Sequence, residues 1–128
     1  MARRSVHIEG FRHANPIPNA SRIGNIVMSG VLLGRDPVSG KPAATLQEQA
    51  ALVFGYMRKT VEAAGGTCED IIKVNVWLRD PADREALNAE WTRMFPDPES
   101  RPARHTQPAP EGPYLVQCDF TAVLQPSG

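Results

Sequence analysis

Two neighbouring stretches of the chain, Arg101-Pro-Ala-Arg-His-Thr106 and Leu115-Val-Gln-Cys-Asp-Phe-Thr-Ala-Val-Leu124, decide the fold that we expect. Successive side chains of a β-strand point to opposite faces, so a strand over the second stretch has one wholly apolar face. Its other face carries an amide, a carboxylate and a hydroxyl, which belong to Gln117, Asp119 and Thr121. The sequence therefore predicts a strand with one face in the core and one polar face that could take part in chemistry.

The first stretch is expected to be extended where it approaches this strand. Pro102 cannot continue a helix, which favours an extended segment over residues 103–107. We therefore expect the guanidinium of Arg104 near the polar strand face, beside a candidate acid or base. A solvated sheet face next to a surface arginine would have the same composition, so the pattern alone leaves both interpretations open.

The strongest helix signal lies between Thr45 and Gly66. Thr45-Leu-Gln-Glu48 matches a capping box, in which the hydroxyl and the carboxylate each bind a free backbone N–H at the helix start. Gly65-Gly66 is suited to the left-handed end of a helix. Apolar residues at steps of three or four form one stripe that we assign to the core: Leu46, Ala50, Val53, Met57, Val61 and Ala64.

Three further elements are expected before and after this helix. A strand over residues 26–33 follows a Gly24-Asn25 turn, and Gly30 within it indicates close approach by another backbone or a ligand. Residues 71–78 are apolar on both faces, as in a central strand that is covered on both sides. Asp80-Pro81 is a good N-cap and first-position pair for a second helix. The apolar stripe of this helix consists of Leu87, Trp91, Met94 and Phe95.

These elements predict an α+β fold in a single domain over residues 1–128. Two amphipathic helices each need an apolar sheet face, and the last strand offers one, so both helices are expected on the same side of the sheet. The other face would then expose a mixed set of residues: Lys73, Asn75, Trp77, Gln117 and Asp119. The apolar members of such a face need cover, and self-association is the simplest source.

The composition excludes several classes of partner. Fourteen basic residues balance fourteen acidic ones, so strong nonspecific binding to nucleic acid or to an anionic membrane is not expected. The chain has no run of 18 apolar residues, and no apolar run follows its basic start, which predicts neither a membrane span nor a signal peptide. Cys68 and Cys118 lack metal or redox spacing and are expected to be reduced thiols in a cytoplasmic protein.

Arg104 is the residue best suited to chemistry. The sequence has no nucleophile-elbow, phosphate-loop or Cys-x-x-Cys motif and no pair of histidines at helical spacing, so a metal site is not expected. A planar guanidinium binds a carboxylate with two parallel hydrogen bonds, which fixes the orientation of a small acid. His105 should point the opposite way, as a structural or solvent-facing residue. Arg101 lies in a polar loop and should contribute little.

The chain resembles the Rid family of reactive-intermediate deaminases, also called the YjgF or L-PSP family. Pro102-Ala-Arg104 and the terminal strand carry the resemblance, and further segments agree in order and spacing between Asn15 and Ala122. These segments are Ile23-Gly-Asn25, Met28-Ser-Gly30, Asp36-Pro-Val-Ser-Gly40, Val61-Glu-Ala-Ala-Gly65 and Ile71-Ile-Lys-Val74. The resemblance implies a mixed sheet of the YjgF or chorismate-mutase type, a homotrimer, and active sites in clefts between subunits.

The resemblance also implies a hydrolytic deaminase of small enamine or imine acids that requires no cofactor. Arg104 would bind the carboxylate of a substrate such as 2-aminoacrylate, water would add to the imine carbon, and ammonia would leave to give a 2-keto acid. The implied substrate pocket further contains Ile17, Ser29, Gly30 and Asn88. Ile17 stands where family members commonly have a tyrosine, so a hydroxyl is missing and the natural substrate stays open.

The residue that positions the attacking water in the family has two candidates here. Aligned backward from the end of the chain, its place falls on Gln117, whereas counting forward from Arg104 places it on Asp119. A glutamine would position water without deprotonating it.

Two other functions stay open. One is binding of a small carboxylate, or regulation by it, without turnover, and the other is RNA cleavage or translation inhibition. Balanced charge and few aromatic residues argue against the RNA function.

Overall fold

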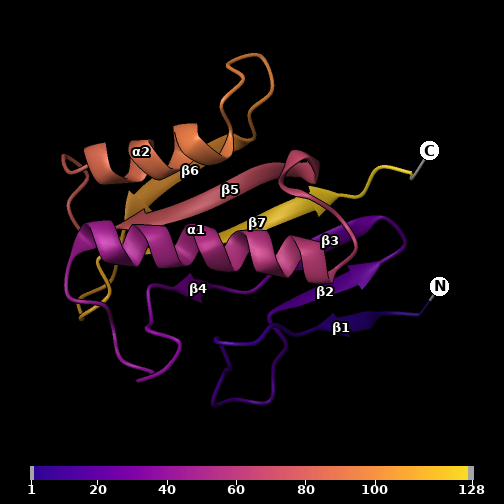
Figure 1. Cartoon of the computed structure of the whole chain (residues 1–128), viewed down its shortest axis with the longest axis horizontal. Coiled ribbons are helices and arrows are strands. Elements are labelled where there is room, and N and C mark those ends of the chain that lie inside the picture. Colours follow the sequence, from indigo (N-terminus) through magenta and orange to yellow (C-terminus); the bar gives the residue numbers. More distant parts are fainter. Residues whose placement is uncertain (1, 127–128) are drawn as a thin grey trace.

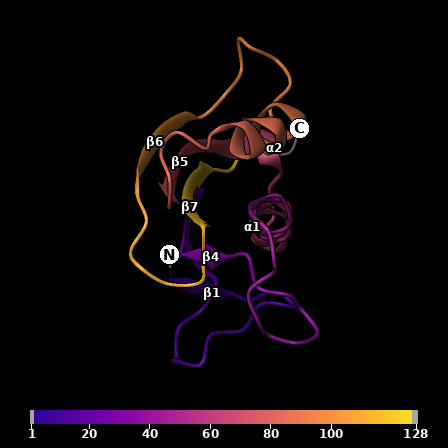
Figure 2. The ribbon, with the colours of Figure 1, turned by 90° about the vertical axis from the view of Figure 1, so that its left-hand side faces the viewer.

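The computed structural model describes residues 2–126, which form one β-sheet with two helices packed on one of its faces (Figures 1 and 2). The elements, in chain order, are β1 (Arg4–Val6), β2 (Ala20–Ile23), β3 (Ile26–Ser29), β4 (Leu32–Leu33), α1 (Leu46–Ala63), the short 3-10 helix η1 (Cys68–Asp70), β5 (Ile71–Leu78), α2 (Glu85–Met94), β6 (Ala103–Pro108) and β7 (Val116–Val123). The predicted α+β class, with both helices on the same side, is confirmed.

The terminal strand β7 is the centre of the sheet. The strand order is β1-β2-β3-β7-β5-β6, and β4 also pairs with β7. Only the β5–β6 pair is parallel, so the sheet is mixed, as the resemblance implied. The apolar face of β7 is buried against the helices, through Val116, Cys118, Phe120 and Ala122. The alternation that predicted this strand is therefore confirmed.

Helix α1 forms where its stripe and its caps predict. The Thr45 hydroxyl accepts a hydrogen bond from the Glu48 N–H at 3.1 Å, which caps the helix start. The second half of the predicted capping box, a bond from a backbone N–H to the Glu48 carboxylate, is not found among residues 2–126. Gly65 has a φ of +102° just after the last turn, a conformation that is costly for any residue with a Cβ. All six residues of the predicted stripe are buried. The helix is thus held by the burial of one apolar face.

The two strand predictions in the middle of the chain need correction. The strand expected over residues 26–33 is two strands, because β3 ends at Ser29 and the chain pairs with β7 again only at β4. In β5 the pairing register with β7 shifts between Ile71 and Lys73, which turns Ile72 outward. Ile72 is 52% exposed, whereas Ile71 is buried. The strand is therefore not covered on both sides by its own chain.

The second helix starts later than its predicted N-cap. Asp80 accepts hydrogen bonds within a turn, from the Ala82 N–H to its side chain and from the Asp83 N–H to its carbonyl, and α2 begins only at Glu85. The prediction of a helix start at Asp80 is wrong because the same side chain can also close an Asx turn. From there on the prediction holds, since Leu87, Trp91 and Phe95 are buried.

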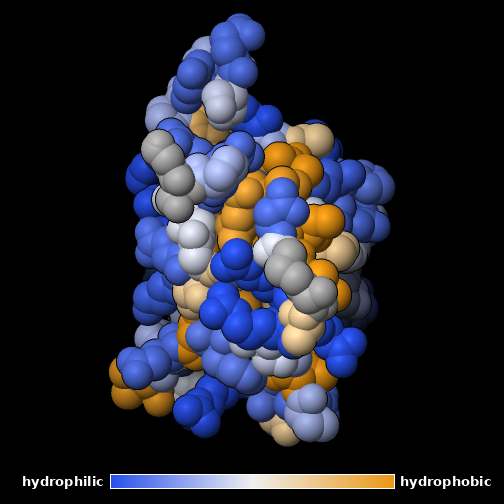
Figure 3. Space-filling view, turned by 90° about the vertical axis from the view of Figure 1, so that its right-hand side faces the viewer, coloured by the Kyte–Doolittle hydropathy of each residue, from blue (hydrophilic) through white to orange (hydrophobic). Residues whose placement is uncertain are grey.

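The face of the sheet opposite the helices is uncovered in this chain. Its residues on β2 and β3 include exposed apolar side chains: Ile23 is 52%, Ile26 52% and Met28 58% exposed. The β2–β3 turn lies at the same end of the molecule as the two described chain ends (Figure 1), and at this end apolar side chains gather among polar ones (Figure 3). No helix in the described part of the chain is long and apolar enough to cross a membrane.

Candidate functional site

Arg104 lies on the edge strand β6 and reaches over helix α2. In the parallel pairing Arg104 is opposite Val74, a buried residue of the helix-covered face, so its side chain takes the same side of the sheet. One guanidinium nitrogen, Nη1, donates a hydrogen bond to Oδ1 of Asn88 at 2.9 Å. The guanidinium carbon lies 4.9 Å from the centre of the Trp91 ring, within the range of a cation–π contact. The guanidinium therefore has a defined position.

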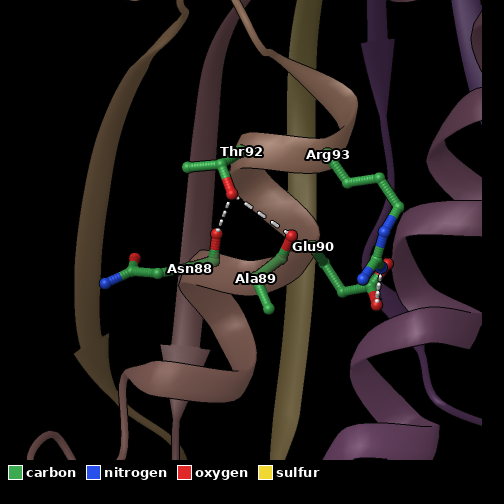
Figure 4. Close-up of polar contacts among 5 residues, drawn as sticks. All are labelled: Asn88, Ala89, Glu90, Thr92 and Arg93. Carbon is green, nitrogen blue, oxygen red and sulfur yellow. Dashed lines mark hydrogen bonds and ion pairs between the residues drawn. The ribbon is translucent and has the colours of Figure 1, made fainter.

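Helix α2 supplies both contacts from one side of its surface. Asn88 and Trp91 are three residues apart, which places them on the same face of a helix. Figure 4 shows the Asn88 side chain extending away from α1, while the ion pair of Glu90 and Arg93 lies on the side that faces α1. The apolar side of α2 is thus anchored in the core, and its outer edge presents an amide and an indole to β6.

The charge of Arg104 is not neutralised within the chain. Among residues 2–126, no carboxylate lies within ion-pair distance of its guanidinium. Partial burial, and then the positive charge of Arg84, lower the pKa of Arg104 from its ordinary value. An arginine stays protonated even with such a shift, so the site keeps a half-buried cation. Such a cation is a ready partner for a carboxylate.

A second polar cluster lies on the uncovered face of the sheet. Asn75 of β5 pairs with Asp119 of β7, and its Nδ2 donates a hydrogen bond to Oδ1 of Asp119 at 2.8 Å. This amide fixes the orientation of the carboxylate while leaving its other oxygen open. Gln117 lies two residues away on the same face, opposite Trp77. His105 also belongs to this face and is exposed, as predicted.

Arg104 and this polar cluster do not meet within one chain. The expectation that Arg104 lies near the polar face of the terminal strand is wrong for two reasons. Strand β5 separates β6 from β7, so the two predicted partners are not on neighbouring strands. The β5–β6 register also places Arg104 with Val74 on the helix side, whereas Asn75 and Asp119 point to the other side.

Ser29 and Gly30 contribute to the sheet. The Ser29 hydroxyl accepts a hydrogen bond from the Phe120 N–H at 2.9 Å and donates one to the Gly30 carbonyl at 2.8 Å. It therefore satisfies a backbone group of β7 in the gap between β3 and β4. The Gly30 N–H donates to the Asn19 carbonyl at 2.9 Å, but no atom comes so close that glycine is required, so the predicted close approach is not found in this chain. A Cβ at Gly30 would make only ordinary contacts there.

Ile17 lies apart from Arg104, in the loop that joins β1 to β2. It is 51% exposed and lines a cavity of about 620 Å³ together with other residues of the same loop, among them His7, Arg12 and His13. Burial, followed by the charge of Arg35, lowers the pKa of His13. No group of three or more metal-binding side chains occurs among the described residues. Strands β3, β7 and β5 lie between β2 and β6, so Ile17 and Arg104 are not brought together within the chain.

Two contributors to the site were missed in the sequence. The spacing of Trp91 predicts a core residue, which is confirmed, but not its contact with Arg104, and Arg84 has the sequence surroundings of an ordinary surface arginine. The signal for both is helical spacing: Arg84, Asn88 and Trp91 are separated by four and three residues, so they share the edge of α2 that carries Asn88. What the sequence did not supply was the register that brings β6 against this edge.

Comparisons with known proteins assign the chain and its fold to a family. A family model described as Endoribonuclease L-PSP matches residues 11–122. A RutC family protein of Haemophilus influenzae is 31% identical over 96 residues, which are 74% of each chain. A 2-iminobutanoate/2-iminopropanoate deaminase of Dermatophagoides farinae is 27% identical over 110 residues, which are 85% of this chain and 84% of the relative.

Solved structures agree over nearly the whole chain. RidA from the Antarctic bacterium Psychrobacter sp. has a TM-score of 0.85 at 26% identity and covers 94% of this chain and 99% of its own. The YjgF gene product of E. coli has a TM-score of 0.84 at 22% identity and covers 95% of this chain and 99% of its own. The molecule is thus a YjgF-type α+β protein. The chain belongs to the Rid family, the one described as Endoribonuclease L-PSP.

Proposed function

We propose that this protein hydrolyses small enamine or imine acids, without a cofactor, to a 2-keto acid and ammonia. The observation that carries the proposal is the oriented, half-buried guanidinium of Arg104, which no carboxylate in residues 2–126 neutralises. Further support comes from the relative named 2-iminobutanoate/2-iminopropanoate deaminase. A small acid with an activated carbon–nitrogen double bond needs an anchor for its carboxylate and a positioned water, and the chain has candidates for both.

In this proposal Arg104 binds the carboxylate of the substrate. Its Nη1 is bound to Asn88 and its plane rests near Trp91, so the remaining N–H groups are held in a fixed direction. Asn88 then acts as a substrate-site residue by orienting the arginine. Water adds to the imine carbon, protons move to the nitrogen, and the carbon–nitrogen bond breaks as ammonia leaves. The carbon ends as the carbonyl of the 2-keto acid.

We further propose that the complete site forms between subunits of a homotrimer. Within one chain Arg104 and Asp119 lie on opposite sides of the sheet, so a cleft that contains both requires a second copy. The exposed apolar residues of β2 and β3 give the uncovered face a reason to associate. Asp119 is the preferred water-positioning residue because Asn75 fixes its carboxylate. Ile17, in the β1–β2 loop, would reach the site in the same way.

The proposal is tested by generating an imine from alanine with an amino-acid oxidase and measuring pyruvate and ammonia as they form. The wild-type protein should accelerate imine hydrolysis well above the uncatalysed rate. Sedimentation should show a trimer, and a monomer at micromolar concentration would remove the site between subunits. A heat-inactivated sample is the control for hydrolysis by the buffer.

Mixed trimers test whether the site is shared. Arg104→Ala and Asp119→Asn alone are each expected to keep about a tenth of wild-type activity or less. When the two chains are co-expressed in equal amounts, random assembly of a ring leaves about a quarter of the shared sites with both native residues, so about a quarter of wild-type activity should return. If Arg104 and Asp119 of the same chain form the site, no activity returns.

A second function is favoured by Ile17. The resemblance expects a tyrosine hydroxyl at this position, and isoleucine offers none. The alternative is a Rid-like protein that binds small carboxylates for regulation and does not turn them over. Calorimetry with pyruvate and propanoate, combined with the imine assay, separates the two: binding that depends on Arg104, without accelerated hydrolysis, would support the alternative.

A cytoplasmic location remains part of the proposal. The two free cysteines, Cys68 and Cys118, support it, because reduced thiols are common there. A Schizosaccharomyces pombe relative named Protein mmf2, mitochondrial, is 39% identical over 62 residues, so organelles are the competing location. Fractionation of cells that express the tagged full-length protein decides between them.

A further inference from the structure

A second arginine, Arg84, lies one helical turn before Asn88, the residue that Arg104 contacts. Arg84 is the N-cap residue of α2, and its carbonyl accepts the Asn88 N–H at 2.8 Å in the first turn. Arg84 is four residues before Asn88 and seven before Trp91, so all three lie along one side of the helix. Arg104 contacts the second and third of them. Arg84 is therefore one turn along the same edge of α2 from the residues that Arg104 contacts.

The side chain of Arg84 is held but not neutralised. Its Nε donates to the Pro81 carbonyl at 2.8 Å, and no carboxylate among residues 2–126 pairs with it. Acidic residues are close in sequence, yet the Asp80 carboxylate accepts the Ala82 N–H instead. The positive charge of Arg84 contributes, after burial, to the lowered pKa of Arg104.

Two unneutralised cations near one another repel, and the repulsion weakens when an anion binds between them. One carboxylate is enough to occupy Arg104. A ligand with a second carboxylate at the far end of a short carbon chain would satisfy both guanidiniums. Neutral or apolar side chains on the substrate would leave Arg84 without a partner.

We propose that Arg84 recognises a second carboxylate, so that the preferred substrates are imines of amino dicarboxylic acids. This inference rests on the proposed deaminase function and specifies its substrate class. Arg104 binds the carboxylate next to the imine carbon, and Arg84 binds the distal one. With the imine of aspartate, water adds to the imine carbon, the carbon–nitrogen bond breaks, and oxaloacetate and ammonia are released.

The test compares two imines that are generated under the same conditions. One is formed from aspartate with an aspartate oxidase, and the other is formed from alanine with an amino-acid oxidase. For the wild-type protein we expect kcat/KM for the diacid to exceed that for the monoacid by roughly tenfold or more. In Arg84→Gln this ratio should fall by roughly 10–100-fold, because a charged hydrogen-bonded contact is lost. Arg93→Gln, on the side of α2 that faces α1, should keep the wild-type ratio.

The outcomes separate this inference from the function on which it rests. If the wild-type protein hydrolyses the monoacid imine but has no preference for the diacid, or if Arg84→Gln lowers both rates equally, the substrate inference is wrong and the deaminase function stands. If neither imine is hydrolysed, the deaminase function fails. Binding then decides the inference alone: succinate should bind more tightly than butanoate, and Arg84→Gln should abolish the difference, whereas equal binding overturns it.

Discussion

The two faces of the sheet present opposite kinds of polar group. On the helix side, Arg104 rests on α2 as a positive charge with an amide and an indole as its neighbours. On the uncovered side, Asp119 is a negative charge held by the Asn75 amide. A chain that placed both on one face would join them in an ion pair and leave neither for a substrate. Their separation by the sheet keeps each free for an external partner.

The largest expected effect is on the uncovered face. Asp119→Asn keeps the shape of the side chain and its contact with Asn75 but removes the base, and general-base catalysis is typically worth about 10²–10⁴ in rate. We expect a loss of that size in kcat for imine hydrolysis. Gln117→Ala, two residues away on the same face, should lose much less.

The two variants also decide between the candidates that the sequence left open. If Gln117→Ala is the more damaging change, Gln117 holds the water-positioning place and Asp119 does not. Equal and small effects would mean that neither side chain touches the reacting water. Circular dichroism and sedimentation of each variant confirm that the fold and the assembly are retained before rates are compared.

The next effect is expected on the helix side. Arg104→Ala removes a charged hydrogen-bond donor, an interaction worth about 1.5–3 kcal/mol, so kcat/KM should fall about tenfold to more than a hundredfold. Arg104→Lys keeps the charge without the planar fork and should restore only part of the activity. Arg93→Ala is the matched control, because Arg93 is exposed and pairs only with Glu90.

Arg101 is unsuitable as that control, although the sequence suggests it. Its Nε donates to the Phe95 carbonyl at 2.8 Å and its Nη2 lies 3.5 Å from the Pro96 carbonyl, so it satisfies free carbonyls at the end of α2. Removal of Arg101 would therefore disturb the end of the helix that carries Asn88 and Trp91, which makes its effect on activity hard to interpret. A deaminase that keeps its full rate in Arg104→Ala, with fold and assembly intact, would end the carboxylate-anchor proposal.

A third prediction tests whether Ser29 stabilises the sheet or contributes to the substrate site. Ser29→Ala leaves the Phe120 N–H without its partner, and an unsatisfied buried donor costs about 1–3 kcal/mol. We expect a lower free energy of unfolding in urea and an unchanged KM. Ser21→Ala, on the neighbouring strand β2, is the control for loss of a strand hydroxyl. A raised KM without loss of stability would return Ser29 to the substrate pocket.

Much of the fold could be predicted because its signals are local. The alternation of β7 and the stripe of α1 each depend on residues within one element, and both are confirmed. The prediction of the start of α2 was wrong because Asp80 can cap either a helix or a turn, and the choice of the turn depends on tertiary packing. The end of β3 at Ser29 could not be predicted for the same reason, because it depends on which segments pair with β7.

Of the predicted substrate-site residues, the structure brings Arg104 and Asn88 together, but the geometry of the candidate site could not be predicted from the sequence. A guanidinium after Pro102 and a carboxylate on the last strand are visible in the sequence, and so is their spacing. Which side of the sheet each one takes depends on the β5–β6 register, where a shift by one residue moves a side chain to the other face. No local pattern contains that information.

The smallest effect tests the support beneath Arg104. Trp91→Leu removes the aromatic face, and a cation–π contact at a partly exposed site is worth about 0.5–1 kcal/mol, so KM should rise about two- to fivefold. Truncation of a large buried ring also destabilises the protein. Phe95→Leu controls for this loss of stability, because Phe95 is also buried and the centre of its ring lies 4.9 Å from the centre of the Trp91 ring. If both variants raise KM equally, the tryptophan only fills the core; a rise in Trp91→Leu alone shows that it positions the arginine.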